Sequence, residues 1–150
     1  LGCMVGGAFA QQTMTEDAVE GLQTLPGTWA GDYFCTGSGQ HGMTLLIDPL
    51  GEKADEAVTY PVTATLWFYP LMSNPDAPKG AFRMEGMIGS LGELDLKPTE
   101  WIEKPSNYGA ANIEGVFDYF DDEIRGLPAG RGAEATGCKA MHLTRLAAAD

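Results

Sequence analysis

The chain has 150 residues, among them 20 glycines and 9 prolines, and its 21 acidic and 9 basic side chains give a formal net charge of −12. This length suits one domain with a hydrophobic core, and the glycines and prolines are typical of many short strands joined by turns. Nucleic acid and anionic membrane surfaces bind clusters of Lys and Arg, so the acidic charge argues against both as partners.

Residues 1–10, LGCMVGGAFA, are apolar and rich in small side chains, and polarity begins at Gln11. The small-x-small run Ala8-Phe9-Ala10 is typical of a secretory cleavage site, so we interpret residues 1–10 as the remnant of a signal peptide. This predicts a periplasmic or secreted protein. Two alternatives are an ordinary buried N-terminus and a lipoprotein motif around Cys3, whose lipidation would anchor the protein to a membrane.

Residues 11–27 are expected to form a helical strap before the main domain, which we place at residues 28–150. Acidic side chains at Glu16 and Asp17 precede apolar residues at helical spacing, which predicts a short helix within residues 13–24. The turn residues Pro26-Gly27 then end the strap.

The first predicted strand covers residues 28–36, where Trp29, Tyr33 and Cys35 share one face by alternation. The glycine run 37–42 that follows has the form G-x-G-x-x-G, but a dinucleotide site needs this string to open a helix. Here it leads into an apolar run, 43–48, that reads as a second strand. We therefore interpret it as a hairpin turn, in which His41 is expected to be an exposed loop residue.

The longest predicted strand covers residues 58–69 and has two different faces. One face is apolar, whereas the other mixes threonines with Trp67 and Tyr69 and could either line a cavity or cover the core at one end of a barrel. The proline-rich segment 70–79 is expected to be a stiff exposed loop. Shorter strands are predicted at 82–88 and 93–97.

The next predicted connection, residues 98–111, is long and carries Trp101 and Tyr108. Such a loop could fold over the mouth of a barrel or pack its own small core. Strands at 112–117 and 124–127 then flank the acidic run 118–123, which lacks the spacing and the glycine of an EF-hand and is read as a solvated turn.

The last predicted strand covers residues 138–146, in which His142 is expected to be hydrogen-bonded. Eight sequential strands predict an all-β fold, an antiparallel up-and-down eight-stranded barrel with a short N-terminal helix, because only closure removes the exposed edges. Closure places the first strand beside the last, where Cys35 and Cys138 would meet and form a disulfide, as an even pair in an exported chain suggests.

Gly27, Trp29 and Arg145 resemble the signature of the calycins, the superfamily of lipocalins and avidins. The resemblance implies that a basic residue of the last strand stacks on the tryptophan of the first. Arg145 and Cys138 have opposite alternation, so both pairings together require a bulge or a twist in the last strand.

A second set of residues extends along nearly the whole chain after residue 10 and includes Tyr33, Cys35, Phe68, Tyr69, Pro70, Phe82, Met84, Trp101, Pro105, Tyr108 and Cys138. In these residues the chain is similar to an uncharacterised bacterial module found in exported proteins, sometimes beside peptidase domains. This second resemblance implies export and the disulfide, and it implies no catalytic residues.

The sequence contains no Gly-x-Ser-x-Gly motif and no zinc-type histidine spacing, and we expect neither catalysis nor a metal or cofactor. The leading hypothesis is an exported, non-catalytic binding module that holds a small apolar or aromatic ligand in the barrel. An alternative is a protein-interaction or inhibitor-like module with a packed interior, which uses loops 70–79 and 101–108; a hydrolase comes third. The candidate ligand-binding residues are Trp29, Tyr33, Trp67, Tyr69 and Trp101.

Overall fold

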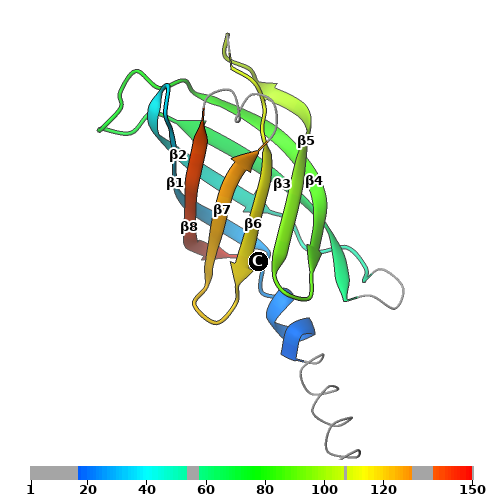
Figure 1. The fold of residues 1–150 in the computed structure, drawn as a ribbon. Helices are drawn as coiled ribbons and strands as arrows, with labels where there is room; N and C mark the ends of the chain where they lie inside the picture. The colour runs from blue at the N-terminus through cyan, green and yellow to red at the C-terminus, as the bar shows by residue number, and fades with distance from the viewer. Residues whose placement is uncertain (1–16, 54–57, 107, 130–136, 150) are drawn as a thin grey trace, which may run out of the picture.

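A computed structural model describes residues 17–53, 58–106, 108–129 and 137–149. Eight antiparallel strands form a closed barrel in chain order, which confirms the predicted fold class (Figure 1). Residues 17–22 form the short helix. The proposed leader, residues 1–10 with Cys3, lies outside the described residues. The strands are β1 (Gly27–Cys35), β2 (Gly39–Ile47), β3 (Thr59–Tyr69), β4 (Gly80–Gly89), β5 (Glu93–Glu103), β6 (Asn112–Asp118), β7 (Glu123–Ala129) and β8 (Cys138–Ala148).

Two strand boundaries differ from the sequence-based expectation by more than two residues. Strand β2 begins at Gly39 rather than after the glycine run, because Gly39 takes a φ of 87° and tightens the hairpin. Strand β5 does not end at Lys97 but continues through Pro98 to Glu103. The β4–β5 register shifts beside Pro98, and a strand tolerates proline at such a bulge because the ladder is already interrupted there.

The seam between β1 and β8 contains the bulge that the sequence required. Two residues of β8, Ala140 and Met141, lie opposite Tyr33 alone, and Ala140 has a φ of 56°. The extra residue reverses the alternation of β8, so Arg145 and Cys138 both face the same side as the inward residues of β1.

A disulfide joins Cys35 to Cys138, as predicted. The two residues are direct register partners at the end of β1 and the start of β8. The bond therefore fastens the barrel seam across a sequence separation of 103 residues.

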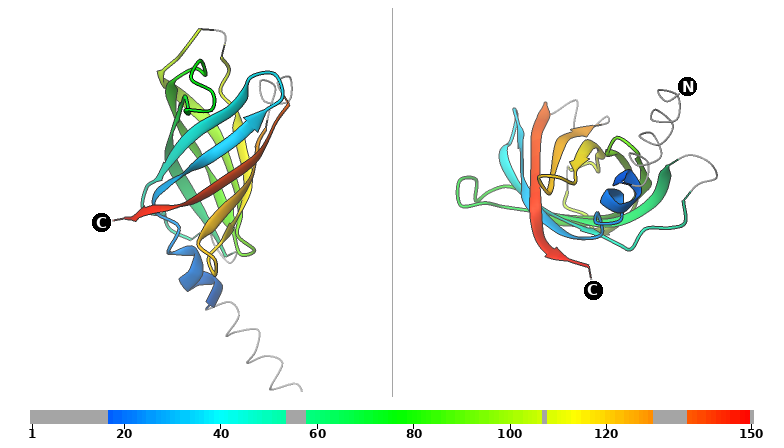
Figure 2. Two further views of the ribbon diagram at one scale, coloured as in Figure 1. Left: turned by 90° about the vertical axis from the view of Figure 1, so that its left-hand side faces the viewer. Right: turned by 90° about the horizontal axis from the view of Figure 1, so that it is seen from below.

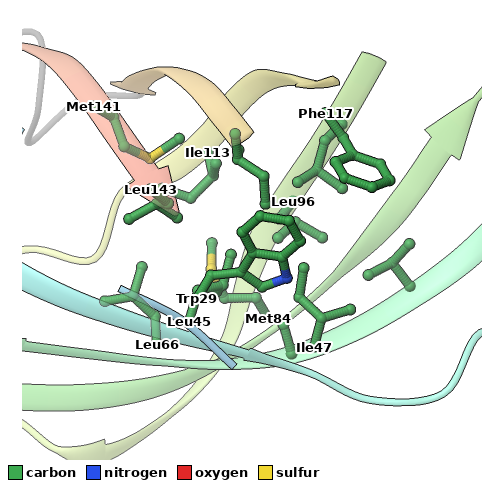
Figure 3. Close-up of a cluster of buried hydrophobic side chains, with 14 of the residues drawn as sticks. Trp29, Leu45, Ile47, Leu66, Met84, Leu96, Ile113, Phe117, Met141 and Leu143 are labelled. Carbon is green, nitrogen blue, oxygen red and sulfur yellow. The ribbon is translucent and has the colours of Figure 1, made fainter. Parts of the chain in front are cut away.

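Side chains fill the barrel interior in the part of the chain that the structure describes (Figure 3). Most inward hydrophobic side chains of the strands expose at most 5% of their surface to water, whereas Trp101 and Cys138 at the end away from the helix are partly buried. A ligand-sized cavity would leave its lining accessible, so this burial indicates packing. The fully buried inward side chains include Trp29, Met43, Leu45, Ile47, Phe68, Met84, Leu94, Leu96, Ile113, Phe117, Ile124 and Leu143.

The short helix lies at the lower end of the barrel in Figure 1, and Figure 2 shows it from below against the barrel opening. Leu22 and Leu25 are completely buried there and belong to the core. In the described residues, no helix has the length and hydropathy needed to cross a membrane.

Candidate binding site at the aromatic end of the barrel

The end of the barrel beside the helix, which we call the closed end, is built on Trp29. The indole Nε1 donates a hydrogen bond of 2.9 Å to the carbonyl oxygen of Leu25, and Phe117 packs edge-on with its ring centre 5.5 Å away. The guanidinium carbon of Arg145 lies 4.3 Å from the centre of the Trp29 ring. The stack implied by the calycin resemblance is therefore present.

Arg145 also ties the segment before β1 to the β6–β7 turn. Its Nε donates to both carboxylate oxygens of Asp122, at 2.8 and 3.0 Å, and its Nη1 donates to the carbonyl oxygen of Pro26 at 3.0 Å. A further bond runs from Nη2 to the carbonyl oxygen of Thr24. Through these bonds, the Arg145 guanidinium helps to close this end of the barrel.

The acidic run 118–123 includes a side chain that stabilises the β6–β7 turn. Asp118 Oδ1 accepts hydrogen bonds from the backbone N–H groups of Phe120 and Asp121, at 3.0 and 3.1 Å. This is the usual way in which an aspartate stabilises a tight turn.

The opposite end, which we call the aromatic end, gathers six rings from β1 to β5 and from the β5–β6 connection. Tyr108 stacks on Phe68 with ring centres 4.4 Å apart, and Trp101 packs edge-on against Phe82 at 5.2 Å. Because such ring pairs bury much apolar area, they close this end without a helix. The six residues are Tyr33, His41, Phe68, Phe82, Trp101 and Tyr108.

His41 is completely buried, so the expectation of an exposed loop residue was wrong. The side chain belongs to β2, and its ring stacks on Tyr33 with centres 5.0 Å apart. Its Nε2 lies 2.7 Å from Ser38 Oγ, whereas its Nδ1 has no hydrogen-bond partner among the described residues. Burial lowers the pKa of His41, which favours the neutral imidazole.

The hydroxyl groups of Tyr33 and Tyr108 share a hydrogen bond. Burial raises the pKa of Tyr33, with a further contribution from Tyr108, and burial also raises the pKa of Tyr108. Both phenols are therefore neutral at physiological pH. The aromatic end offers ring faces and uncharged hydrogen-bonding groups.

The predicted site residues do not lie together. Tyr33 and Trp101 both belong to the aromatic end, but Trp29 lies at the closed end. Trp67 and Tyr69 point to the outer face of β3, where Trp67 is 38% exposed and Tyr69 OH lies 2.9 Å from Thr44 Oγ1. The alternation of β3 already allowed this placement.

Sequence reasoning missed four members of the aromatic end as site residues: His41, Phe68, Phe82 and Tyr108. The alternation of β3 puts Phe68 on the apolar face, which was a usable signal. No local pattern marks His41 or Tyr108, because their contacts depend on the register of β1 with β2 and on the path of a loop.

His142 differs from its expectation. Its Nε2 lies 3.6 Å from Glu123 Oε1, beyond hydrogen-bond distance, and has no hydrogen-bond partner in the described part of the chain.

Loop 70–79 is fixed to the β1–β2 hairpin by one side chain. Asn74 Nδ2 donates to the carbonyl oxygens of Ser38 and Gln40, at 2.6 and 2.8 Å. Leu71 and Asn74 also form an isolated bridge within the loop. The loop is therefore ordered, and it holds Met72 fully exposed.

A groove of about 460 Å³ lies over the outer face of β4 and β5 and does not enter the barrel. Its lining is mixed in character and comprises Glu85, Gly86, Met87, Asp95, Lys97, Pro98 and Thr99.

A scan with models of known protein families gives no match to this sequence, and a search of the curated proteins also gives none.

Proposed function

We propose that this chain is a non-catalytic binding module that engages another protein through loops at the aromatic end of the barrel. The observation that carries the proposal is the packed interior, in which most inward hydrophobic side chains are at most 5% exposed. A ligand held inside the barrel would have to displace several of these side chains. The packed barrel therefore supports the loop-based alternative over the ligand carrier that the sequence put first.

Loop 70–79 supports this proposal because it presents an apolar side chain on a fixed backbone. Asn74 holds the loop against the β1–β2 hairpin, and Pro70, Pro75 and Pro78 restrict its backbone. A preorganised loop loses little conformational entropy on binding. Met72, which is fully exposed, is suited to insert into an apolar pocket of a partner.

The end of β5 offers a second contact. Ile102 is 58% exposed, next to Trp101, whose ring packs against Phe82 beneath. The Nζ atom of Lys104 lies 5.9 Å from the centre of the Trp101 ring. Exposed apolar groups beside a partly buried aromatic residue are common where proteins bind one another.

The chemistry of the aromatic end supports binding rather than catalysis. Its two phenols and its imidazole are all neutral because burial disfavours their charged forms. A general base or acid works best with a pKa near the operating pH, and these shifts move Tyr33, Tyr108 and His41 away from it.

We also propose that the barrel is calycin-like and that the protein is exported. The Trp29–Arg145 stack supports the first proposal, and the Cys35–Cys138 disulfide supports a periplasmic or secreted location. In an alternative form of this proposal, a lipidated Cys3 anchors the exported protein to a membrane.

Capture of a partner tests the main proposal. Purified protein is cross-linked in the exported fraction of the source cells and compared with Met72→Ser/Ile102→Ser. The matched control is Leu91→Ser/Phe120→Ser, which removes two exposed apolar side chains from hairpin tips at the closed end. We expect wild type and control to capture the same protein and the Met72/Ile102 variant to lose it. Equal capture by all three forms would contradict the proposal.

A further inference from the structure

The barrel wall is split at the aromatic end, between β5 and β6. The β5–β6 ladder runs only from Glu93↔Val116 to Leu96↔Ile113, whereas β5 continues to Glu103. The connection that follows therefore passes beside the upper half of β5 without joining its ladder (Figure 1). Tyr108 belongs to this connection.

Tyr108 contacts the barrel as a bound phenol would. Its ring stacks on Phe68 at 4.4 Å with an interplanar angle of 20°, and its hydroxyl bonds to that of Tyr33. His41 also lies nearby, with its ring centre 6.4 Å from that of Tyr108. We call the surroundings formed by Tyr33, His41 and Phe68 the aromatic box.

The segment that carries Tyr108 is held to the barrel mainly by side chains. The described residues of the connection, 104–106 and 108–111, form no backbone hydrogen bond with the rest of the described chain. Segments with few backbone bonds open at low free energy. Exchange of the Tyr108 ring for another ring therefore requires no disruption of the strand ladders.

We propose that the aromatic box is a binding site for a small neutral phenol, which takes the position of the Tyr108 ring. The ligand ring would stack on Phe68, and its hydroxyl would bond to Tyr33. This site goes beyond the proposed contact with another protein, because it uses buried residues rather than Met72 and Ile102.

Two features of the box select a neutral ligand that carries a hydroxyl group. Removal of Tyr108 from the box leaves the buried Tyr33 hydroxyl without its partner, which an apolar ring could not replace. His41 Nδ1 is also buried and has no partner among the described residues. Burial raises the pKa of Tyr33 and lowers that of His41, so the box holds no charge to stabilise a phenolate.

Titration with p-cresol, which matches the tyrosine side chain, tests this site. Wild-type protein is followed by the NMR signals of Tyr33, His41 and Phe68, with toluene as the ligand that lacks the hydroxyl. We expect millimolar p-cresol to shift these signals and those of the displaced Tyr108 ring. Absence of any shift in the wild-type protein would overturn the proposal.

Two variants distinguish a specific site for a phenol from a hydrophobic cavity that binds any ring. Tyr108→Ala removes the internal competitor, and we expect p-cresol to bind at least about tenfold more tightly than to wild type and about fivefold more tightly than toluene. Adding Tyr33→Phe should abolish the preference over toluene. If Tyr108→Ala binds toluene as tightly as p-cresol, the proposal is wrong.

A control removes a ring from the other end of the barrel. Tyr119→Ala deletes the ring that packs against Phe117 and Gly21 at the closed end. We expect no gain in p-cresol affinity there. Should Tyr108→Ala fail to fold, Tyr108→Phe takes its place, because loss of the hydroxyl weakens the internal competitor and must still raise p-cresol affinity. These outcomes are independent of partner capture, which Met72 and Ile102 decide.

Discussion

The two ends of this barrel are closed by different physical means. At the closed end the segment that follows the helix, a buried tryptophan and an arginine form one hydrogen-bonded unit, in which Arg145 donates to Asp122 and to two backbone carbonyls. At the aromatic end six rings and a disulfide do the closing, and His41 Nδ1 is left without a partner among the described residues.

This difference indicates which end is available for binding. The polar groups of Arg145 are engaged by their own chain, so a ligand there would have to break several charge-assisted bonds. At the aromatic end, a ligand ring can take the place of a ring of the protein, because any ring of similar shape can stack on Phe68. The closed end therefore supplies stability, and the aromatic end is the better candidate for function.

The largest expected effect comes from Trp29→Ala, which removes the central side chain of the closed end. Trp29 is completely buried between Phe117 and Arg145, so its removal should lower the free energy of unfolding by about 3–5 kcal/mol. Urea denaturation measures the change. Trp67→Ala on the outer face is the matched control, with an expected loss of about 1 kcal/mol or less. Equal losses would mean that Trp29 does not support the closed end.

Removal of the disulfide should weaken the aromatic end more than the closed end. Replacing Cys35 and Cys138 by serine reopens a connection of 103 residues, and we expect a loss of about 2–4 kcal/mol in the free energy of unfolding. Hydrogen exchange should rise near Phe34 and Lys139 before it rises near Trp29. Uniform acceleration along β1 would show that the bond acts only on the unfolded chain.

Arg145→Ala should cost about 2 kcal/mol, since it removes charge-assisted hydrogen bonds and the contact with Trp29. Arg125→Ala is the matched control, because Arg125 also forms an ion pair, with Glu123 at 3.0 Å, but its side chain is 64% exposed. An exposed pair of this kind contributes about 0–1 kcal/mol. If the two variants have similar midpoints of urea unfolding, Arg145 does not stabilise the protein more than an exposed ion pair does.

The smallest effect is the pH dependence that arises from His41. Burial lowers its pKa in the folded protein, so near the unfolded pKa of 6.5 the unfolded chain binds more protons. The stabilisation is present above that pKa and is lost as the pH falls below it, by at most about 1.4 kcal/mol per pH unit. His41→Gln removes this contribution, and urea unfolding between about pH 7 and pH 5 compares the two proteins. Parallel pH profiles would contradict the assigned neutral state.

The strands, the seam and the disulfide could be read from the sequence with little error. Alternation along β1 and β3 is a local property, and the strand count together with the two cysteines pointed to one closure. Sequence reasoning also required the bulge that the structure places at Ala140. Sequence reasoning missed the extension of β5 through Pro98. The proline is tolerated there because the register between β4 and β5 shifts beside it, and this shift is not visible in the sequence.

The site was less predictable than the fold. Trp29, Tyr33, Trp67, Tyr69 and Trp101 were chosen as aromatic residues on promising strands, but ring type does not determine which rings meet. Trp67 and Tyr69 lie outside the barrel, and Trp29 belongs to the other end. His41, placed in a loop by its glycine neighbours, is instead a buried member of β2.

The sequence by itself determined the barrel and its closing disulfide, because side-chain alternation and chain order restrict how strands can close on one another. The Trp29–Arg145 stack was expected only from the resemblance to the calycins. Only the tertiary structure decided that the interior is packed and that Tyr33, His41, Phe68 and Tyr108 share one end. The physical reason is that these contacts join residues far apart in the chain. Their meeting depends on strand register and on the path of the β5–β6 connection, which local pattern does not encode.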